Sequence, residues 1–324
     1  MTVNITIIGM GKIGTSVGLA LARHSEQLHR IGHDLYPEFS RRAQKLGAVD
    51  KIAYNLPGSV ADADIIFLAL PADQIRDTMK HIAHDLKEGA VVMDTAPTKG
   101  AVSGWAGEFL PEKRYYVGLS PVINPKYMLV EESGGEAARE DLFKDGMIGI
   151  VAPQGTSSAA IKLAADLTSL LGAKPLFMDI VEVDSLMAAT HLVPQLVAAG
   201  MVGATADQPG WTEGRKVAGA PYALAGSALG AVDPPEAIAS AAALNKEHVI
   251  RVLDNVLVTL ISFKEKLQDG EYEALAEQLK RIRDAREDWL GKRFSGEWEE
   301  GPAGIDLPTA GEEMRRWIVG RRRE

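Results

Sequence analysis

Three glycines near the N-terminus carry the clearest chemical signal in the chain. They lie in the loop Gly9-Met10-Gly11-Lys12-Ile13-Gly14, between a β-type run over residues 5–8 and a segment with helical periodicity. Glycines at this spacing let a strand turn tightly into a helix and let the backbone approach a pyrophosphate, which the amides at the helix start bind. We therefore predict that a dinucleotide binds at Gly9, Gly11, Lys12, Ile13 and Gly14.

Asp34 lies about twenty residues after Gly14, at the end of the second predicted strand. A carboxylate in that position accepts hydrogen bonds from an adenosine ribose and repels a 2′-phosphate, which favours NAD over NADP. Arg41 and Arg42 follow in the next predicted helix and could face such a phosphate. NAD is therefore the expected cofactor, and NADP is the alternative.

Polar and proline residues follow two further predicted strands. In an open parallel sheet, ligands bind beyond the carboxyl ends of the strands, the side that we call the carboxyl edge. Leu70, Pro71 and Thr95 are expected to line the cofactor there. Thr98 and Lys99 are expected to reach the nicotinamide or the substrate as catalytic groups.

The elements that must position these residues alternate between short apolar runs and helical patterns, which is typical of βαβ units around a buried parallel sheet. The expected strands cover residues 5–8, 29–33, 65–69, 90–94, 115–118, 147–151 and 175–179. We predict an α/β fold over residues 1–179, a dinucleotide-binding domain with a Rossmann-type, doubly wound parallel sheet.

After residue 179 the β pattern stops and long segments rich in Ala and Leu predict an all-α domain over residues 180–324. Residues 184–206 are expected to form one helix that is buried on all sides. Residues 237–266 and 271–290 are expected to form two further helices. One helical domain cannot bury all the apolar faces of these helices alone, so we expect a homodimer. The helical domain is expected to bind the substrate and to form the dimer contact.

The charge balance limits the class of partner. A net charge of −9 argues against nucleic-acid binding, which requires clustered Lys and Arg. The basic segment over residues 314–323 is interpreted as a solvated C-terminal turn. A small-molecule substrate is therefore the expected partner.

The absence of cysteine excludes disulfides and thiolate chemistry and fits a reducing cytoplasm. The first residues lack the pattern of a signal peptide, and no run is expected to approach the 18 or more apolar residues of a membrane span. No histidine has a metal-ligand spacing to a second ligand. We expect a cytoplasmic protein without membrane contact or metal.

Four segments together resemble the prephenate and arogenate dehydrogenase family, in which a Rossmann domain precedes a helical dimerisation domain. They cover residues 7–16, 94–99, 117–121 and 187–194. The resemblance implies an NAD(P)-dependent oxidoreductase of tyrosine biosynthesis, which oxidises a cyclohexadienol by hydride transfer and releases a carboxylate as the ring becomes aromatic. Such chemistry needs a proton acceptor at the hydroxyl and cations for an anionic substrate.

Three positions depart from the family pattern. Family members carry a histidine, which polarises the substrate hydroxyl, where this chain has Ser120. A family serine is replaced by Pro97, with Thr98 beside it as a possible hydroxyl substitute. The threonine–arginine pair that binds the substrate carboxylate is missing from residues 222–227, so the available cations are Lys99, Arg215 and Lys216.

His191 is retained on the first helix of the second domain, where related β-hydroxyacid dehydrogenases carry a catalytic lysine. An imidazole can act as a general base near neutral pH, although a buried structural histidine explains it equally well. Either Ser120 or His191 is expected to handle the proton. The departures leave two alternatives open: a dehydrogenase or imine reductase for a different small substrate, and a non-catalytic dinucleotide-binding sensor.

Overall fold

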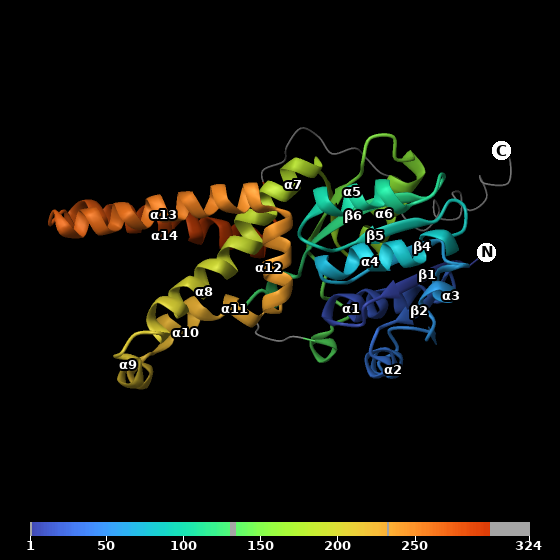
Figure 1. The fold of residues 1–324 in the computed structure, drawn as a ribbon, viewed down its shortest axis with the longest axis horizontal. Coiled ribbons are helices and arrows are strands. Elements are labelled where there is room, and N and C mark those ends of the chain that lie inside the picture. Colours follow the sequence, from blue (N-terminus) through green and yellow to red (C-terminus); the bar gives the residue numbers. More distant parts are fainter. Residues whose placement is uncertain (1, 130–133, 232, 299–324) are drawn as a thin grey trace.

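The computed structural model describes residues 2–129, 134–231 and 233–298. One eight-stranded sheet fills the N-terminal half, and the described residues that follow it are helical (Figure 1). The predicted fold class is confirmed: a Rossmann-type sheet precedes an all-α region. The basic segment over residues 314–323 lies outside the described residues.

The strand order of the sheet is β3-β2-β1-β4-β5-β6-β7-β8. Its members are β1 (Val3–Ile8), β2 (Leu28–His33), β3 (Lys51–Ile52), β4 (Ile65–Leu68), β5 (Val91–Asp94), β6 (Tyr115–Val122), β7 (Met147–Val151) and β8 (Lys174–Phe177). The sequence predicted seven of these strands and missed β3, which has only two residues. The chain moves outward from β1 in both directions, so the sheet is doubly wound.

The last three strands depart from the predicted all-parallel arrangement. β7 runs antiparallel to β6, and β8 is parallel to β7. Asp94 at the end of β5 pairs with Gly118, whereas β6 continues to Val122 and pairs there with Met147. β6, β7 and β8 therefore extend beyond the carboxyl edge that the shorter strands form, and Ser120 lies on this extension.

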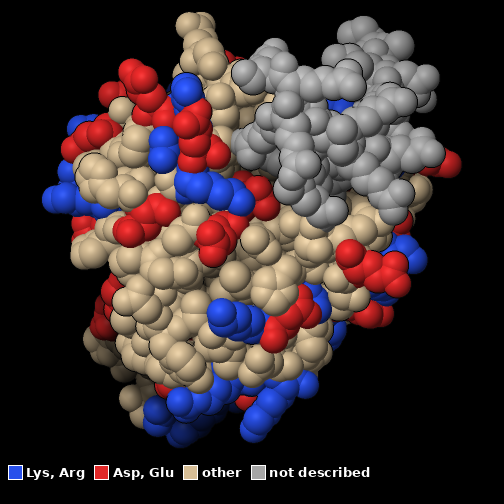
Figure 2. Space-filling view, turned by 90° about the vertical axis from the view of Figure 1, so that its right-hand side faces the viewer, with Lys and Arg blue, Asp and Glu red and all other residues tan. Residues whose placement is uncertain are grey.

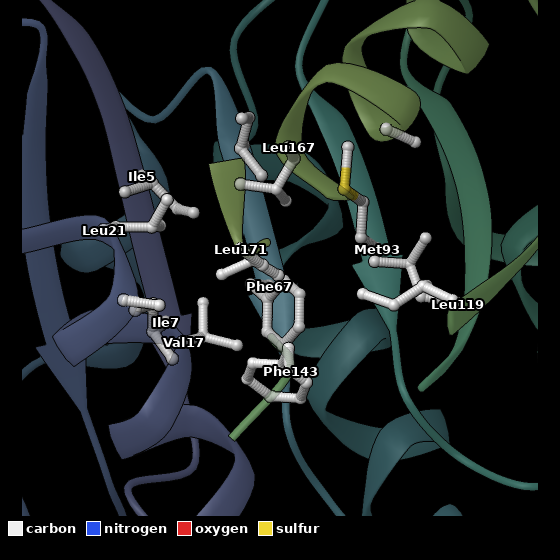
Figure 3. Packing of buried hydrophobic residues seen from close by; sticks show 14 of the residues in the cluster. Ile5, Ile7, Val17, Leu21, Phe67, Met93, Leu119, Phe143, Leu167 and Leu171 are labelled. Atoms are coloured by element: carbon white, nitrogen blue, oxygen red, sulfur yellow. The ribbon is translucent and has the colours of Figure 1, made fainter. Parts of the chain in front are cut away.

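Helices cover both faces of the sheet. The face shown in Figure 3 packs Ile5, Phe67 and Leu119 against α1 (Lys12–Leu21), α2 (Pro37–Lys45) and α6 (Ser158–Leu170). The opposite face packs against α3 (Leu56–Val60), α4 (Ala72–Ile82) and α5 (Lys99–Phe109), and residues of the helical half join the same core.

The helical half begins with one continuous helix, Ile180–Ala206. It comprises α7 (Ile180–Met187), a π turn η5 (Ala188–Leu192) and α8 (Val193–Ala206). The glycine-rich segment that follows forms the short helices α9 (Trp211–Val217), α10 (Ala220–Gly226) and α11 (Ala228–Ala231). The remaining helices are α12 (Pro235–Leu244), α13 (Lys246–Gln268) and α14 (Tyr272–Ser295).

The helical half projects away from the sheet, and α13 and α14 form an antiparallel pair at its far end (Figure 1). Apolar side chains on this pair lie exposed, among them Leu257, Val258 and Leu260. Many side chains of residues 184–206 are exposed within one chain, so the expected burial on all sides would need a second copy of the chain. The helix Ile180–Ala206 is also long and apolar enough to cross a membrane by length and composition, contrary to the expectation from sequence.

Candidate active site

Two of the three loop glycines are required by packing within the chain. Gly9 has φ +95°, and a Cβ on it would lie 2.3 Å from the carbonyl oxygen of Ala69. A Cβ on Gly14 would lie 1.9 Å from the carbonyl oxygen of Gly9. Larger residues at these two positions would therefore separate β1, α1 and the end of β4.

Gly11 is different, because a Cβ there would meet no atom of the chain within 4 Å. It precedes α1, whose N-terminus has no side-chain cap and no acidic residue in its first turn. A helix start leaves backbone N–H groups without partners in the helix and attracts anions. The space at Gly11 and this uncapped helix start fit the pyrophosphate of a dinucleotide.

Asp34 follows β2 and is held beside the same loop. One carboxylate oxygen accepts a hydrogen bond from the Met10 amide at 2.7 Å, and the other from the Tyr36 amide at 2.9 Å. Each oxygen keeps a further lone pair for a ribose hydroxyl. The carboxylate thus lies where the sequence predicts it.

The two arginines of α2 that could favour NADP have other contacts. Arg42 lies 3.4 Å from Glu136 and 5.2 Å from the centre of the Phe39 ring. Arg41 lies over the ring of Tyr54 at 5.9 Å. Figure 2 shows basic side chains along the lower edge of this end of the molecule, the height at which α2 lies in Figure 1.

Leu70, Pro71 and Thr95 lie at the carboxyl edge next to the glycine loop. The backbone N–H of Thr95 donates to the Leu68 carbonyl at 3.2 Å, and Pro71 begins α4 as its N-cap. A Cβ on Gly9 would lie 3.0 Å from Leu70 Cδ2. All three residues are partly exposed, as lining residues would be.

Lys99 is not available to a substrate. Its ammonium is fully buried and lies 2.9 Å from an Asp94 carboxylate oxygen and 3.2 Å from the Asp94 carbonyl oxygen. The hydroxyl of buried Tyr116 donates to the other Asp94 carboxylate oxygen at 2.7 Å. The structure therefore contradicts the predicted catalytic position of Lys99. We call these three residues the Asp94 cluster.

Electrostatics in the Asp94 cluster follow from its burial. Burial lowers the pKa of Lys99, an effect that the charge of Asp94 opposes. Burial also raises the pKa of Tyr116 well above its ordinary value, and the neighbouring carboxylate adds to this, so the phenol stays protonated and donates. A Cβ on Gly118 would lie 2.7 Å from the Tyr116 hydroxyl and 2.8 Å from Lys99 Cδ, which explains the glycine.

Asp184 of the helical half binds the start of α5. Its two carboxylate oxygens accept hydrogen bonds from the Lys99 amide at 2.5 Å and the Gly100 amide at 2.8 Å. Its own carbonyl accepts a hydrogen bond from the Asn245 side chain at 2.7 Å. A residue of the second half thus fixes the segment that follows β5, from which Thr95 and Thr98 project.

Ser120 and Thr98 are buried at the same edge, and the hydroxyl of each lacks a partner among the described residues. Ser120 lies on the face of β6 that also carries Tyr116 and Gly118. A Cβ on Gly149 would lie 3.4 Å from both Ser120 Cβ and Met178 Sδ. A buried hydroxyl without a partner is costly unless a ligand or water completes it, so both groups fit a binding role.

His191 lies in the π turn η5, a geometry that is frequent at functional sites. Its Nε2 lies 2.7 Å from a carboxylate oxygen of Asp233, which also accepts a hydrogen bond from Gln195 at 3.2 Å. We call these three residues the His191 cluster. Burial would raise the pKa of Asp233, but the hydrogen bond and charge of His191 lower it below the ordinary value.

Two further polar side chains have local partners. Asn124, which follows β6, donates from its side-chain amide to the Asp141 carbonyl, and its side-chain oxygen accepts from the Lys126 N–H. Lys216 pairs with Glu213 within α9, where both side chains are exposed. Among the described residues, no group of three or more acidic or histidine side chains could hold a metal.

Comparisons with known proteins agree with this geometry. Residues 17–176 match the nucleotide-binding domain of prephenate dehydrogenase. This stretch therefore resembles the nucleotide-binding domain of the prephenate dehydrogenase family. Prephenate dehydrogenase of Bacillus subtilis is 28% identical over 199 residues, which are 61% of this chain and 52% of that protein. The Lactococcus lactis prephenate dehydrogenase is 32% identical over 44% of this chain and 38% of its own length.

Solved structures of the family share the fold of both halves. A prephenate dehydrogenase from A. aeolicus, in complex with hydroxyphenyl propionate and NAD+, aligns with a TM-score of 0.77 at 22% identity, over 89% of this chain and 98% of that one. Synechocystis arogenate dehydrogenase aligns with a TM-score of 0.71 at 20% identity, over 88% and 99%. The matched segments are 52% and 38% of the lengths of the two sequence relatives. At 20–22% identity, the solved structures show likeness of fold alone.

Asp233 and Asp184 could not be predicted from the sequence. Asp233 lies in a short Pro-containing segment, 42 residues from the histidine that it binds, and no spacing rule connects the two. Asp184 marks the start of the helical pattern, but its partners lie 84 and 85 residues away at the start of α5. Only the fold brings these groups together.

Proposed function

We propose that the chain is an NAD-dependent dehydrogenase of the prephenate/arogenate type, which oxidises a small carboxylated alcohol, with decarboxylation when the substrate is a cyclohexadienol. The observation that carries the proposal is the glycine loop, where Gly9 and Gly14 are fixed by packing while Gly11 faces open space at an uncapped helix start. The family of the nucleotide-binding domain and the NAD+ in the A. aeolicus structure support the same cofactor.

Asp34 supports NAD rather than NADP. Its carboxylate is pinned by two backbone amides beside the glycine loop, so it can accept ribose hydroxyls without reorganising. A 2′-phosphate there would meet a fixed negative charge. Arg42 does not offset that charge, since it is already paired with Glu136.

The chain's own part in catalysis is proton handling at the carboxyl edge. NAD, when bound, accepts the hydride from the alcohol carbon. His191 is proposed to take the hydroxyl proton, because Asp233 holds one ring nitrogen and stabilises the imidazolium that forms. The Ser120 and Thr98 hydroxyls are proposed to orient the substrate through their unused hydrogen-bonding capacity.

We also propose a cytoplasmic homodimer. Exposed apolar side chains follow the helical half from α8 to α14, among them Val197, Leu257, Ile261, Ile282 and Trp289. A second copy that packs against this half would bury them, whereas a monomer would leave a large apolar surface in water. Sedimentation of the full chain as a dimer is the expected result, and a monomer at micromolar concentration would contradict it.

The test of the function is a dinucleotide titration combined with turnover measurements. The protein is expected to bind NAD at least ten-fold more tightly than NADP and to reduce it with prephenate or arogenate. Gly11→Ala should weaken NAD binding by about 10-fold or more without lowering the melting temperature, because its methyl enters the cofactor space. Failure of the native protein to bind either dinucleotide would overturn the proposal.

A different small substrate is a second candidate, favoured by Ser120 in place of the family histidine and by the burial of Lys99. Turnover of other hydroxy acids or cyclic imines, with none of prephenate or arogenate, would select it. NAD binding without turnover of any of these would instead indicate the sensor.

A further inference from the structure

Arg293 is a buried cation near the C-terminal end of α14. It is 4% exposed, although the helix around it is almost wholly solvent-exposed. Its Nη2 donates a hydrogen bond to the carbonyl oxygen of Ile123, and its Nε is buried without a partner. A guanidinium offers five N–H donors, so most of its hydrogen-bonding capacity is unused.

No carboxylate of the described residues neutralises this guanidinium. The acidic side chain that lies along the same loop, Asp141, already binds Lys126 and the Tyr127 hydroxyl. Burial lowers the pKa of Arg293, and no compensating charge raises it. A buried charge without a counterion is costly, and an anionic ligand would relieve that cost.

The position of Arg293 connects it with the candidate active site. α14 returns from the far end of the helical half towards the sheet and contacts the short turn η3 (Pro125–Tyr127), which follows β6 (Figure 1). Ile123 comes directly after β6, three residues beyond Ser120. At about 3.3 Å per residue along an extended chain, the two positions lie about 10 Å apart.

We propose that Arg293 binds the carboxylate of the substrate, in a site that runs from Ser120 to the end of α14. The assignment rests on the proposed function, since it supplies the cation that an anionic substrate needs. A planar guanidinium binds a carboxylate through two parallel N–H···O bonds and is the side chain best matched to that group.

Arg293 thus replaces a residue that the sequence lacks. The threonine–arginine pair of the family is absent from residues 222–227, and Lys99 is committed to the Asp94 cluster. Arg215 and Lys216 lie on α9, where neither side chain is buried. Among the described cations, Arg293 combines burial with the absence of an anionic partner and a place beside the loop after β6.

The test compares hydroxyphenylpropionate with its uncharged amide, with binding measured by calorimetry on the full chain in the presence of NAD. The native protein should bind the acid about 10- to 100-fold more tightly than the amide. Arg293→Gln should lose that preference while it keeps NAD affinity and amide affinity, and Arg293→Lys should retain part of it. Arg283→Gln, an exposed position on the same helix, should behave as native.

Equal binding of acid and amide by the native protein would overturn the assignment, whether or not the variant folds. Retained preference in folded Arg293→Gln would overturn it as well. Competition by inorganic phosphate at millimolar concentration, as strong as that by the acid, would indicate a general anion site and contradict the carboxylate assignment. If the native protein prefers the acid but turns over no alcohol, the proposed function fails while the role of Arg293 stands.

Discussion

The two clusters of charged side chains in this chain are built in opposite ways. In the Asp94 cluster, Lys99 and Asp94 are wholly buried and Tyr116 completes the carboxylate. In the His191 cluster, the side chains of His191 and Asp233 are 26% and 31% exposed, and the Gln195 side-chain oxygen has no partner among the residues that the structure describes. The side chains of the Asp94 cluster are therefore shielded from solvent, whereas those of the His191 cluster are partly exposed to it.

This difference in burial indicates a structural role for the Asp94 cluster and a chemical role for the His191 cluster. A fully buried ion pair presents no group to a substrate, so its role is to hold β5, α5 and β6 in register. A histidine whose partner is fixed but whose ring is partly open can exchange a proton. Variants of the two clusters test this division between a structural and a chemical role.

The largest expected effect is on turnover. His191→Asn should lower kcat by about 10²- to 10⁴-fold, the usual contribution of a general base, with little change in stability. Steady-state kinetics with prephenate or arogenate measure it. His81→Asn, at an exposed histidine of α4, is the matched control. Native-like turnover of His191→Asn would contradict this role and would indicate that Ser120 handles the proton of the substrate hydroxyl.

Lys99→Met should have the next largest effect, on stability. It leaves the Asp94 carboxylate buried without its cation, which costs about 3–5 kcal/mol of unfolding free energy. Denaturant unfolding measures this cost. Lys99→Met combined with Asp94→Asn should recover part of it, because the remaining group is neutral. A loss below about 1 kcal/mol in the single variant would show that the cluster is not structural.

A smaller effect is expected where the two halves meet. Asp184→Asn keeps one acceptor oxygen for the α5 amides but loses the negative charge. The free energy of unfolding should therefore fall by about 1–2 kcal/mol. The same variant should raise KM for NAD more than it lowers kcat, since Asp184 positions the segment after β5. Unchanged KM with lowered stability would assign Asp184 a purely structural role.

The smallest expected effect is the loss of stability at low pH that arises from the His191 cluster. The pKa of Asp233 is lowered in the folded protein, so its contribution to stability is present above its ordinary pKa and is lost as pH falls through the folded value. Because the pair is partly exposed, the contribution is below about 1 kcal/mol. By thermal unfolding, Asp233→Asn should therefore be less stable than the native protein at about pH 5, and this difference should shrink as the pH falls below the ordinary pKa of an aspartate. A constant difference would contradict this.

The sequence predicted the fold better than the site. Alternating apolar runs and the glycine loop determine β1, α1 and Asp34 locally, so these were placed correctly. Lys99 was misplaced because its direction depends on the neighbouring strand, where Gly118 leaves room for its stem. Asp233 and Arg293 reach their sites only through the folding of the helical half, and no local pattern marks such partners.

The π turn η5 sets the rotational phase between α7 and α8. Asp184 precedes it and is bound to the first half, whereas Gln195 follows it and belongs to the His191 cluster. Successive residues of an α-helix are about 100° apart around its axis. Deletion of one residue within Ala188–Leu192 would therefore turn α8 by about that angle relative to α7 and rotate its apolar face away from any partner that the native phase selects.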